Sequence, residues 1–420
     1  MIKPEEFPYI KSLYVNDCYA YKDFNIELQD YKPFSHLILT GKNGSGKSTI
    51  LKAINREFLP KETGQDWPTA TVYAITSEPD GTKTYKESTV KGSPISLVNI
   101  SLAIKHNKKT GTGLMSPGEV LSLYPKAYSF FEAKRKYGNQ QVEGPTKESD
   151  FIGRLNTKDS TNYFTSTFKQ YLVNKKIEQA FAQIDQKVEQ LMLTQSFFET
   201  LRQRFSEVFG QQVKLIDFDH KNYEFYFNLE DGRRLTFDTL SDGSFALLSI
   251  LMDLFIRVDL IRKQVNNYVY DPCGIVLIDE PETHLHLQLQ EQVLPLLTSL
   301  FPNIQFIVAT HSPAVIASIK NATVFDLTTK ESRDSEETVG RSYSDLMMSH
   351  FDLNNEYSSI ADDIINQVDQ AVAEFGNDPA RLREKLRPIY DTNSAYLSPT
   401  LKVKFELLMA EQEAKAVAHS

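Results

Sequence analysis

Cysteine is scarce in this chain of 420 residues. Cys18 and Cys273 are the only two, and neither belongs to a C-x-x-C pair or a Cys/His cluster. The sequence therefore offers neither a disulfide framework nor a structural zinc site. Such sparing use of cysteine is typical of a reducing compartment, so we expect a cytoplasmic protein that folds around a hydrophobic core.

Long apolar runs and an excess of positive charge are missing as well. The opening MIKPEEFPYIKSLYV has no basic region followed by an apolar stretch, and no segment approaches the roughly 18 apolar residues of a membrane span. Secretion and membrane insertion are not expected. The net charge of -9 does not indicate a nucleic-acid binder, although a local basic surface around Lys105, Lys108 and Lys109 stays open.

A glycine-rich turn stands between a predicted strand and a predicted helix. The apolar segment 36–40 leads into Gly-Lys-Asn-Gly-Ser-Gly-Lys-Ser at 41–48, the phosphate cradle, and helical sequence follows to Phe58. This is the pattern G-x-x-x-x-G-K-[ST], in which backbone N–H groups surround phosphates, the lysine reaches the β- and γ-phosphates and the hydroxyl binds Mg²⁺. We expect ATP contacts from Gly41, Asn43, Gly44, Ser45, Gly46, Lys47, Ser48 and Thr49, with Ser48 also a metal ligand.

Two further predicted strands end in polar residues. The apolar run 275–278 ends at Asp279 and Glu280, and the run 306–309 leads to His311. Ligands of a doubly wound sheet bind at the carboxyl ends of its strands, so these residues should face the same crevice as the cradle. Asp279 would hold Mg²⁺, usually through water, and Glu280 would orient or deprotonate the attacking water. His311 would donate to the γ-phosphate, although a lone histidine at a strand end is more often structural.

A fourth motif, the signature turn Leu-Ser-Asp-Gly-Ser at 240–244, opens an apolar segment that begins near Phe245 and is expected to be a buried helix. The amino end of a helix can bind an anion. Alternatively, Ser241 or Asp242 simply caps the helix.

In this order the four motifs resemble those of ABC-type ATPases, and more narrowly of the RecF, SMC and OLD-like branch. The stretch 279–286, Asp-Glu-Pro-Glu-Thr-His-Leu-His, is similar to the DEPE-x-HLH pattern of that branch. The resemblance covers residues 1 to about 350 and implies an α/β fold, a P-loop NTPase with an ABC-type ATPase head, a helical insertion and a helical C-terminal extension. It also implies a homodimer that sandwiches ATP, with Glu280 as catalytic carboxylate, His311 as switch histidine, and Ser241 and Gly243 acting on the ATP of the opposing chain.

The sequence departs from the transporter branch of that family in several places. The signature turn replaces the Leu-Ser-Gly-Gly-Gln of transporters, and His286 stands where they carry the Asp of the D-loop. Only Gln140 and Gln141, after the strand-like segment 127–131, are candidates for the Q-loop glutamine, and they are weak ones. The acidic cluster of a TOPRIM nuclease is also missing from the end of the chain. We therefore expect an ATPase without its own nuclease rather than a transporter subunit.

These expectations divide the chain into four parts. They are an N-terminal ATPase lobe (1–60), an insertion that is first strand-poor and then helical (61–210), a C-terminal ATPase lobe (211–330) and a helical tail (331–420). The about 190 residues between the cradle lysine and the signature turn are too few for SMC-type arms at a rise of about 1.5 Å per residue. Within that branch, the chain is therefore expected to resemble the compact relatives that lack such arms.

Two functions fit such a compact relative. The first is the stand-alone ATPase of Septu and retron-type antiviral systems, which would work with a separate nuclease docked on its tail. The alternative is a RecF-like ATPase that clamps duplex DNA directly. The acidic balance of the whole chain favours a protein partner.

Apolar residues recur at helical spacing in two further regions. The stripe between Phe181 and Val208 predicts one long helix or two stacked ones, packed on its own domain or on a second copy as a coiled coil. The stripes from Ile360 to Val372 and from Leu401 to Leu408 predict tail helices. The tail helices would pack on the chain's own core or accept an effector.

Overall fold

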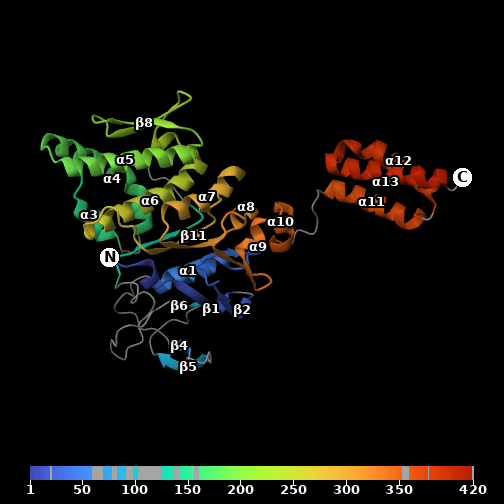
Figure 1. The fold of residues 1–420 in the computed structure, drawn as a ribbon, viewed down its shortest axis with the longest axis horizontal. Coiled ribbons are helices and arrows are strands. Elements are labelled where there is room, and N and C mark those ends of the chain that lie inside the picture. The colour runs from blue at the N-terminus through green and yellow to red at the C-terminus, as the bar shows by residue number, and fades with distance from the viewer. Residues whose placement is uncertain are drawn as a thin grey trace. The chain divides into compact units, whose positions relative to one another are not determined.

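The computed structural model describes residues 1–18, 21–58, 70–77, 83–90, 98–102, 124–135, 142–155, 160–351, 359–376 and 378–418. The local basic surface left open around Lys105 and the two glutamines at 140 and 141 lie outside the described residues. The chain forms two compact units, Met1–Leu346 and Met347–Ser420, and each has a hydrophobic core of its own (Figure 1). Within the described ranges, no helix combines the length and the apolar character needed to cross a bilayer.

Unit 1 is built on a six-stranded sheet with the order β14-β13-β3-β12-β11-β7. Neighbouring strands are parallel except β13 and β14, and β3, β11, β12 and β13 are buried along their whole lengths, as parallel strands covered on both faces should be. The strands are β3 (His36–Thr40), β7 (Ala127–Phe131), β11 (Gly274–Asp279), β12 (Ile304–Ala309), β13 (Ala322–Asp326) and β14 (Glu331–Asp334).

One helix and a second, smaller sheet cover one face of this sheet. Strands β1 (Ile10–Cys18) and β2 (Tyr21–Glu27) pair antiparallel, as their alternating sequence predicts, and β6 (Val98–Leu102) joins β1 on its other edge. Helix α1 (Lys47–Phe58) lies between the two sheets (Figure 1). One core joins the three layers, with members such as Leu13, Ile26, Ile50, Ile54, Leu37 and Leu277.

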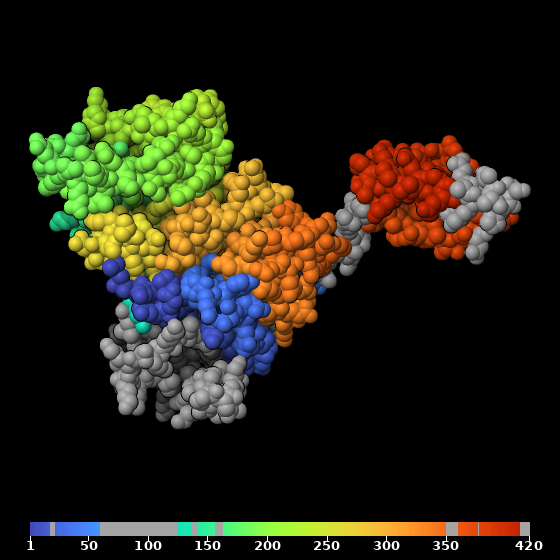
Figure 2. All heavy atoms as spheres, in the orientation of Figure 1, coloured from blue at the N-terminus to red at the C-terminus, as the bar shows by residue number. Residues whose placement is uncertain are grey.

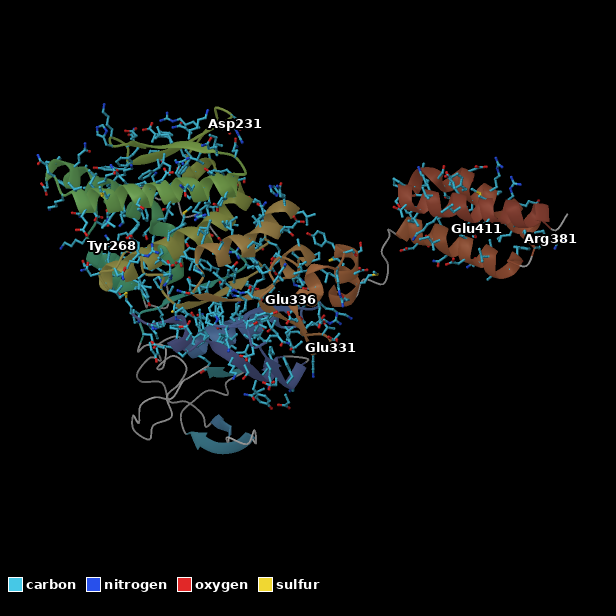
Figure 3. All side chains as sticks on the ribbon, viewed as in Figure 1. Asp231, Tyr268, Glu331, Glu336, Arg381 and Glu411 are labelled. Carbon is cyan, nitrogen blue, oxygen red and sulfur yellow. The ribbon has the colours of Figure 1, made fainter. Side chains whose placement is uncertain are left out.

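Helices cover the other face. Helix α6 (Asp242–Gln264) packs on β7 and is buried at every position from Phe245 to Leu254, which confirms the helix expected there. The predicted 181–208 stripe forms two helices, α4 (Ser160–Ile184) and α5 (Val188–Phe209), and the chain reverses between them. The hairpin β8 (Val213–Asp219), β9 (Glu224–Leu229) and β10 (Arg234–Leu235) follows, with Asp231 in its last turn (Figure 3).

The apolar stripe of α4 and α5 is covered along only part of its length. Phe198, Phe205 and Val208 are buried, whereas Phe181 is 59% exposed and Ile184 73% exposed beside the reversal of the chain. The lobe that contains these helices forms one end of unit 1 (green in Figure 2). Packing on the chain's own domain therefore accounts for the half of the stripe nearest the β8–β9 hairpin.

An ion pair lies in the middle of α6. The Arg257 guanidinium donates to both carboxylate oxygens of Asp253, at 2.6 and 3.1 Å, and to the carbonyl of Leu155 at 3.0 Å. Both charged side chains are completely buried. Burial raises the pKa of Asp253, and the arginine and the Ser129 hydroxyl of β7 oppose that shift. The pair thus links α6 to β7 and to Leu155 at the end of α3 (Glu148–Arg154).

Unit 2 consists of three helices that pack on one another, α11 (Ser359–Phe375), α12 (Pro379–Asn393) and α13 (Pro399–Ala418). The predicted tail stripe supplies their shared core, including Ile364, Leu401 and Phe405. Ile360 and Val372 of the same stripe remain 56% and 36% exposed. Arg381 and Glu411 mark α12 and α13 in Figure 3.

The remaining elements are short or peripheral. They are β4 (Ala70–Ser77), β5 (Lys83–Val90), α3 (Glu148–Arg154), α7 (Leu287–Leu300), α8 (Pro313–Ile316), α9 (Ser335–Val339), α10 (Tyr343–Phe351) and the 3-10 turns η1 (Pro4–Glu6), η2 (Phe237–Thr239) and η3 (Ser394–Tyr396).

Candidate active site

The phosphate cradle joins β3 to α1, as its sequence predicts. Its three glycines all have positive φ, at 127°, 79° and 96° for Gly41, Gly44 and Gly46. A side chain at Gly41 would also collide with the loop after β13, because its Cβ would lie 2.9 Å from Thr328 Oγ1. The same hydroxyl accepts from the Lys42 N–H at 3.0 Å. Glycine is therefore required at position 41 both for its dihedral angles and for this close approach.

Lys47 is folded back into the cradle. Its Nζ donates to the carbonyls of Gly41 and Lys42 at 2.8 and 3.0 Å, and the residue is only 5% exposed. Burial lowers the pKa of Lys47 to about 8, and the nearby carboxylates of Glu280 and Asp279 oppose that shift. The ammonium group thus lies inside the cradle, bound to its backbone carbonyls, with acidic side chains close by.

Ser48 and Asp279 meet at the carboxyl end of the sheet. The Ser48 hydroxyl forms a hydrogen bond with the Asp279 carboxyl group, whose pKa is raised by burial and by Glu280. The other oxygen, Asp279 Oδ1, is buried and has no hydrogen-bond partner among the described residues. A buried acceptor without a partner costs about 1–3 kcal/mol, so such an atom calls for a ligand, an ion or water.

Glu280 lies in the acidic turn, residues 279–286, and adopts a strained backbone. Its φ is 49° and that of His284 is 64°, a region that side-chain-bearing residues avoid at a cost of about 1–3 kcal/mol. Thr283 stabilises the turn, since its Oγ1 donates to the Glu280 carbonyl at 3.0 Å. The strained residue therefore lies directly after Asp279, the last residue of β11.

His311 follows β12, which pairs directly with β11. The backbone N–H of His311 donates to Glu282 Oε1 at 2.7 Å. This hydrogen bond joins the acidic turn to the residue that follows the end of β12. Burial and the charge of Lys47 lower the pKa of His311, while Glu280 raises it. The imidazole is therefore neutral near pH 7, within electrostatic range of both Lys47 and Glu280.

The signature turn lies against the acidic turn of the same chain. Ser241 is the N-cap of α6, because its Oγ accepts from the Ser244 N–H at 3.3 Å. A Cβ at Gly243 would lie 2.4 Å from the carbonyl oxygen of His284, so a side chain there is excluded. Both turns carry exposed residues, Ser241 and His286 among them. His286 caps α7, where its Nδ1 accepts from the Leu289 N–H at 3.3 Å.

Comparison with known proteins agrees with this geometry. The family model described as "AAA domain, putative AbiEii toxin, Type IV TA system" matches residues 142–317, which include the signature turn, the acidic turn and His311. The "Retron Vc95 probable ATPase" of Vibrio cholerae serotype O1 biovar El Tor is 25% identical over 376 residues, 70% of this chain and 71% of its own. The "Septu protein PtuA" of Bacillus mycoides (strain KBAB4) is 26% identical over 322 residues, 74% of this chain and 39% of its own.

The chain is a P-loop ATPase. The chain has the nucleotide-binding cradle, the acidic turn and the strand order described above, and relatives of it are named as ATPases. Among solved structures, the Smc head domain derived from Pyrococcus furiosus aligns with 79% of this chain and 98% of its own at 15% identity and a TM-score of 0.41. A TM-score of 0.41 is too low to support a further conclusion about the ATPase.

The structure brings most of the predicted site residues together. Lys47, Ser48, Asp279, Glu280 and His311 interact through hydrogen bonds or nearby charges at one end of the sheet. Ser241 and Gly243 of the ATPase are instead placed beside the acidic turn, through the contact with His284.

Arg135 is a site residue that sequence reasoning missed. It comes from the loop after β7, and its Nη2 donates to the backbone carbonyls of Asp279 at 2.7 Å and Glu280 at 3.2 Å. Its Nε and Nη1 are buried without a partner in the described part of the chain, and so is Glu282 Oε2. Burial lowers the pKa of Arg135 to about 10, which leaves it charged near pH 7. No motif marks such an arginine, because its partners are main-chain atoms about 145 positions away.

Proposed function

We propose that this ATPase binds ATP with Mg²⁺ between two copies that meet head to tail in the cytoplasm, and that hydrolysis there controls a separate nuclease or other effector in antiviral defence. The observation that carries the catalytic part is the meeting of Lys47, Ser48, Asp279 and Glu280 at the carboxyl ends of parallel strands. The relatives named after retrons and Septu support the role in defence.

The residues present fit Mg²⁺. This ion takes oxygen ligands and is held by one or two side chains together with substrate phosphates. Asp279 Oδ1, buried and without a partner among the described residues, and the Ser48 hydroxyl beside it are such a pair. In the described ranges no cluster of three or more His, Cys, Asp or Glu side chains competes for the ion. When bound, Mg²⁺ would neutralise charge on the β- and γ-phosphates.

The other residues divide the remaining work. The cradle N–H groups of Asn43 to Thr49 and the Lys47 ammonium bind the phosphates. Glu280 orients the attacking water and accepts its proton, and His311, neutral near pH 7, donates a hydrogen bond to the γ-phosphate. The exposed signature turn offers Ser241 and the N–H of Gly243 to the ATP of the second copy, at the amino end of α6.

Lys47→Ala tests the nucleotide site. Removing the ammonium should lower ATP affinity or turnover by at least tenfold while circular dichroism shows the same helix and strand content, because Lys47 forms its hydrogen bonds within the cradle alone. Lys176→Ala, on α4, is the matched control. Unchanged affinity together with unchanged turnover in Lys47→Ala would overturn the proposed site.

Complementation between two variants tests the head-to-tail arrangement. Glu280→Gln spoils a site from the cradle side and Ser241→Arg spoils it from the signature side, so neither variant alone should hydrolyse ATP. A mixture forms heterodimers that contain one intact composite site, and turnover should return to part of the wild-type value. If Ser241→Arg alone keeps wild-type turnover, the signature turn does not act on a second copy.

Removal of residues 352–420 tests effector docking. The cut leaves α10 whole and removes the three helices that form unit 2. We expect ATP binding to persist and co-purification with the effector encoded beside this gene to disappear. Full recovery of the effector by the shortened chain would contradict docking on unit 2, and tight binding of duplex DNA by the whole chain would favour a DNA clamp instead.

A further inference from the structure

Arg135 contacts the backbone of the residue that the proposed function makes catalytic. Its Nη2 donates to the carbonyls of both Asp279 and Glu280, one on each side of the bend where β11 ends. A single planar NH₂ group that serves two consecutive carbonyls restrains the peptide between them. That peptide is the one that leads into the positive φ of Glu280.

Two other residues also restrain the bend. Thr283 donates to the Glu280 carbonyl through its Oγ1 at 3.0 Å and through its backbone N–H at 3.2 Å, and the Glu280 N–H donates to the Ala309 carbonyl at 2.8 Å. An unfavourable backbone conformation persists only where its surroundings over-determine it. Arg135 supplies two of the contacts that do so here, from the loop that follows β7, the strand paired with β11.

The remaining donors of Arg135 show that it is not an ordinary structural arginine. Arg202, on α5, also donates to a backbone carbonyl, that of Val213 at 2.6 Å, but its Nε and Nη2 are paired with Glu199. Arg135 leaves Nε and Nη1 buried and unpaired among the described residues, and the acidic turn that it contacts contains Glu282 Oε2, which is buried and unpaired there as well. An arginine kept for stability alone would pair these donors, since unpaired buried groups weaken the fold.

We propose that Arg135 is a positioning residue, which holds the strained backbone of Glu280 so that its carboxylate faces the attacking water. This inference rests on the hydrolytic role proposed for Glu280. It assigns the arginine to hydrolysis and not to the binding of ATP, because its hydrogen bonds among the described residues go to the acidic turn.

Arg135→Ala in the full chain should therefore separate turnover from binding. We expect turnover to fall by about 10–100-fold, as for other residues that orient a catalytic group, while the affinity for a non-hydrolysable ATP analogue changes less than about threefold. The thermal midpoint should stay or rise, because two unpaired buried donors are removed. Arg135→Lys, which retains a donor but not the planar fork, should recover part of the lost turnover.

Arg202→Ala is the matched control. It removes an arginine whose described donors are all paired, so it should lower the thermal midpoint and leave turnover per folded molecule unchanged. If Arg135→Ala behaves in the same way, with a lower midpoint and normal turnover, the arginine is structural and the inference is overturned.

A double-mutant cycle locates the effect on Glu280. Glu280→Gln should lower single-turnover hydrolysis by about 10²–10⁴-fold, and adding Arg135→Ala to it should cost little more, since the group being positioned is already lost. A full further loss in the double variant, or a matching loss of analogue affinity, would place Arg135 on the phosphates instead. If Glu280→Gln itself keeps wild-type turnover, it is the proposed function that fails and not the contact of Arg135.

Discussion

Two parts of unit 1 keep charged groups away from water, and they do so differently. In α6 the Arg257–Asp253 pair is completely buried, and the guanidinium donates to a carboxylate and to a carbonyl. In the acidic turn after β11, Asp279 Oδ1 and Glu282 Oε2 are buried without partners among the described residues. The first arrangement is complete in the chain alone, whereas the second still needs a ligand.

Removing a charge from the complete arrangement should have the largest effect on stability. Arg257→Ala leaves the buried Asp253 carboxylate without its partner, and we expect the free energy of unfolding of unit 1 to fall by about 3–5 kcal/mol. Urea titration followed by the fluorescence of unit 1 measures it. The double variant Arg257→Met with Asp253→Leu should recover most of the loss, because apolar side chains of similar volume replace the pair. A loss below about 1 kcal/mol in Arg257→Ala would show that the pair does not hold α6 to β7.

The contact between the signature turn and the acidic turn should rank second. Gly243→Ala forces a Cβ to within 2.4 Å of the His284 carbonyl, and backbone cannot yield as a side chain can. We expect unfolding to become about 1–3 kcal/mol easier, as in overpacked sites. Gly340→Ala is the control, since its Cβ meets nothing within 4 Å and its φ is -91°. Equal thermal midpoints for the two variants would mean that the turns are not packed in this way.

Removing a charge from the incomplete arrangement should have the opposite sign. Asp279→Asn takes away a buried carboxylate whose pKa is raised by burial, and we expect the nucleotide-free chain to gain about 1–2 kcal/mol in stability. Mg²⁺-dependent ATP turnover should be lost at the same time. Calorimetry with and without Mg²⁺ and ATP measures both effects. A destabilised Asp279→Asn chain would remove the contrast between the two regions.

His36 provides a smaller, pH-dependent test in a third buried place. It is buried at the start of β3, where its Nδ1 accepts from the Phe306 N–H at 3.0 Å, and burial lowers its pKa to about 3. The unfolded chain binds a proton below about pH 6.5 and the folded chain does not, so stability falls as the pH drops from about 6.5 towards 3. Between pH 7 and 5.5 the wild type should lose about 1 kcal/mol more than His36→Gln. Equal losses of stability in the wild type and in His36→Gln would contradict this effect of His36. His220→Gln, which replaces a histidine at an exposed site, is the control and should lose as much stability as the wild type.

The residues of the site that could be predicted are those that belong to short, local sequence patterns. The cradle's strand, turn and helix, the buried strand before Asp279 and the strand before His311 each have a local pattern. The one helix between β11 and β12 is consistent with their pairing but also with a position one strand apart. Sequence also placed the tail stripe on helices, but could not tell that most of it packs within unit 2.

The rest of the site depends on pairings between distant segments. Insertion of β3 between β12 and β13 brings Thr328 against Gly41, and the pairing of β7 with β11 brings Arg135 to Glu280. Neither residue type is unusual after a strand, so no local signal could separate them from other loop residues. The sequence indicates a ligand-binding role for Gly243. Its close approach to the His284 carbonyl is a second reason why glycine occupies this position, and only the fold reveals it.

The reversal between α4 and α5 has a consequence for amide hydrogen exchange. Near it the helices expose Phe181, Ile184 and Val188, so few apolar contacts oppose the opening of the last turn of α4 and the first turn of α5. Amides there should exchange through local fraying within seconds to minutes, whereas those of β3, β11 and β12 should wait for global unfolding. The exchange rate along α5 should therefore fall steadily from Val188 towards Phe205, as the helix passes from solvent into the aromatic cluster of Phe205, Phe227 and Phe237.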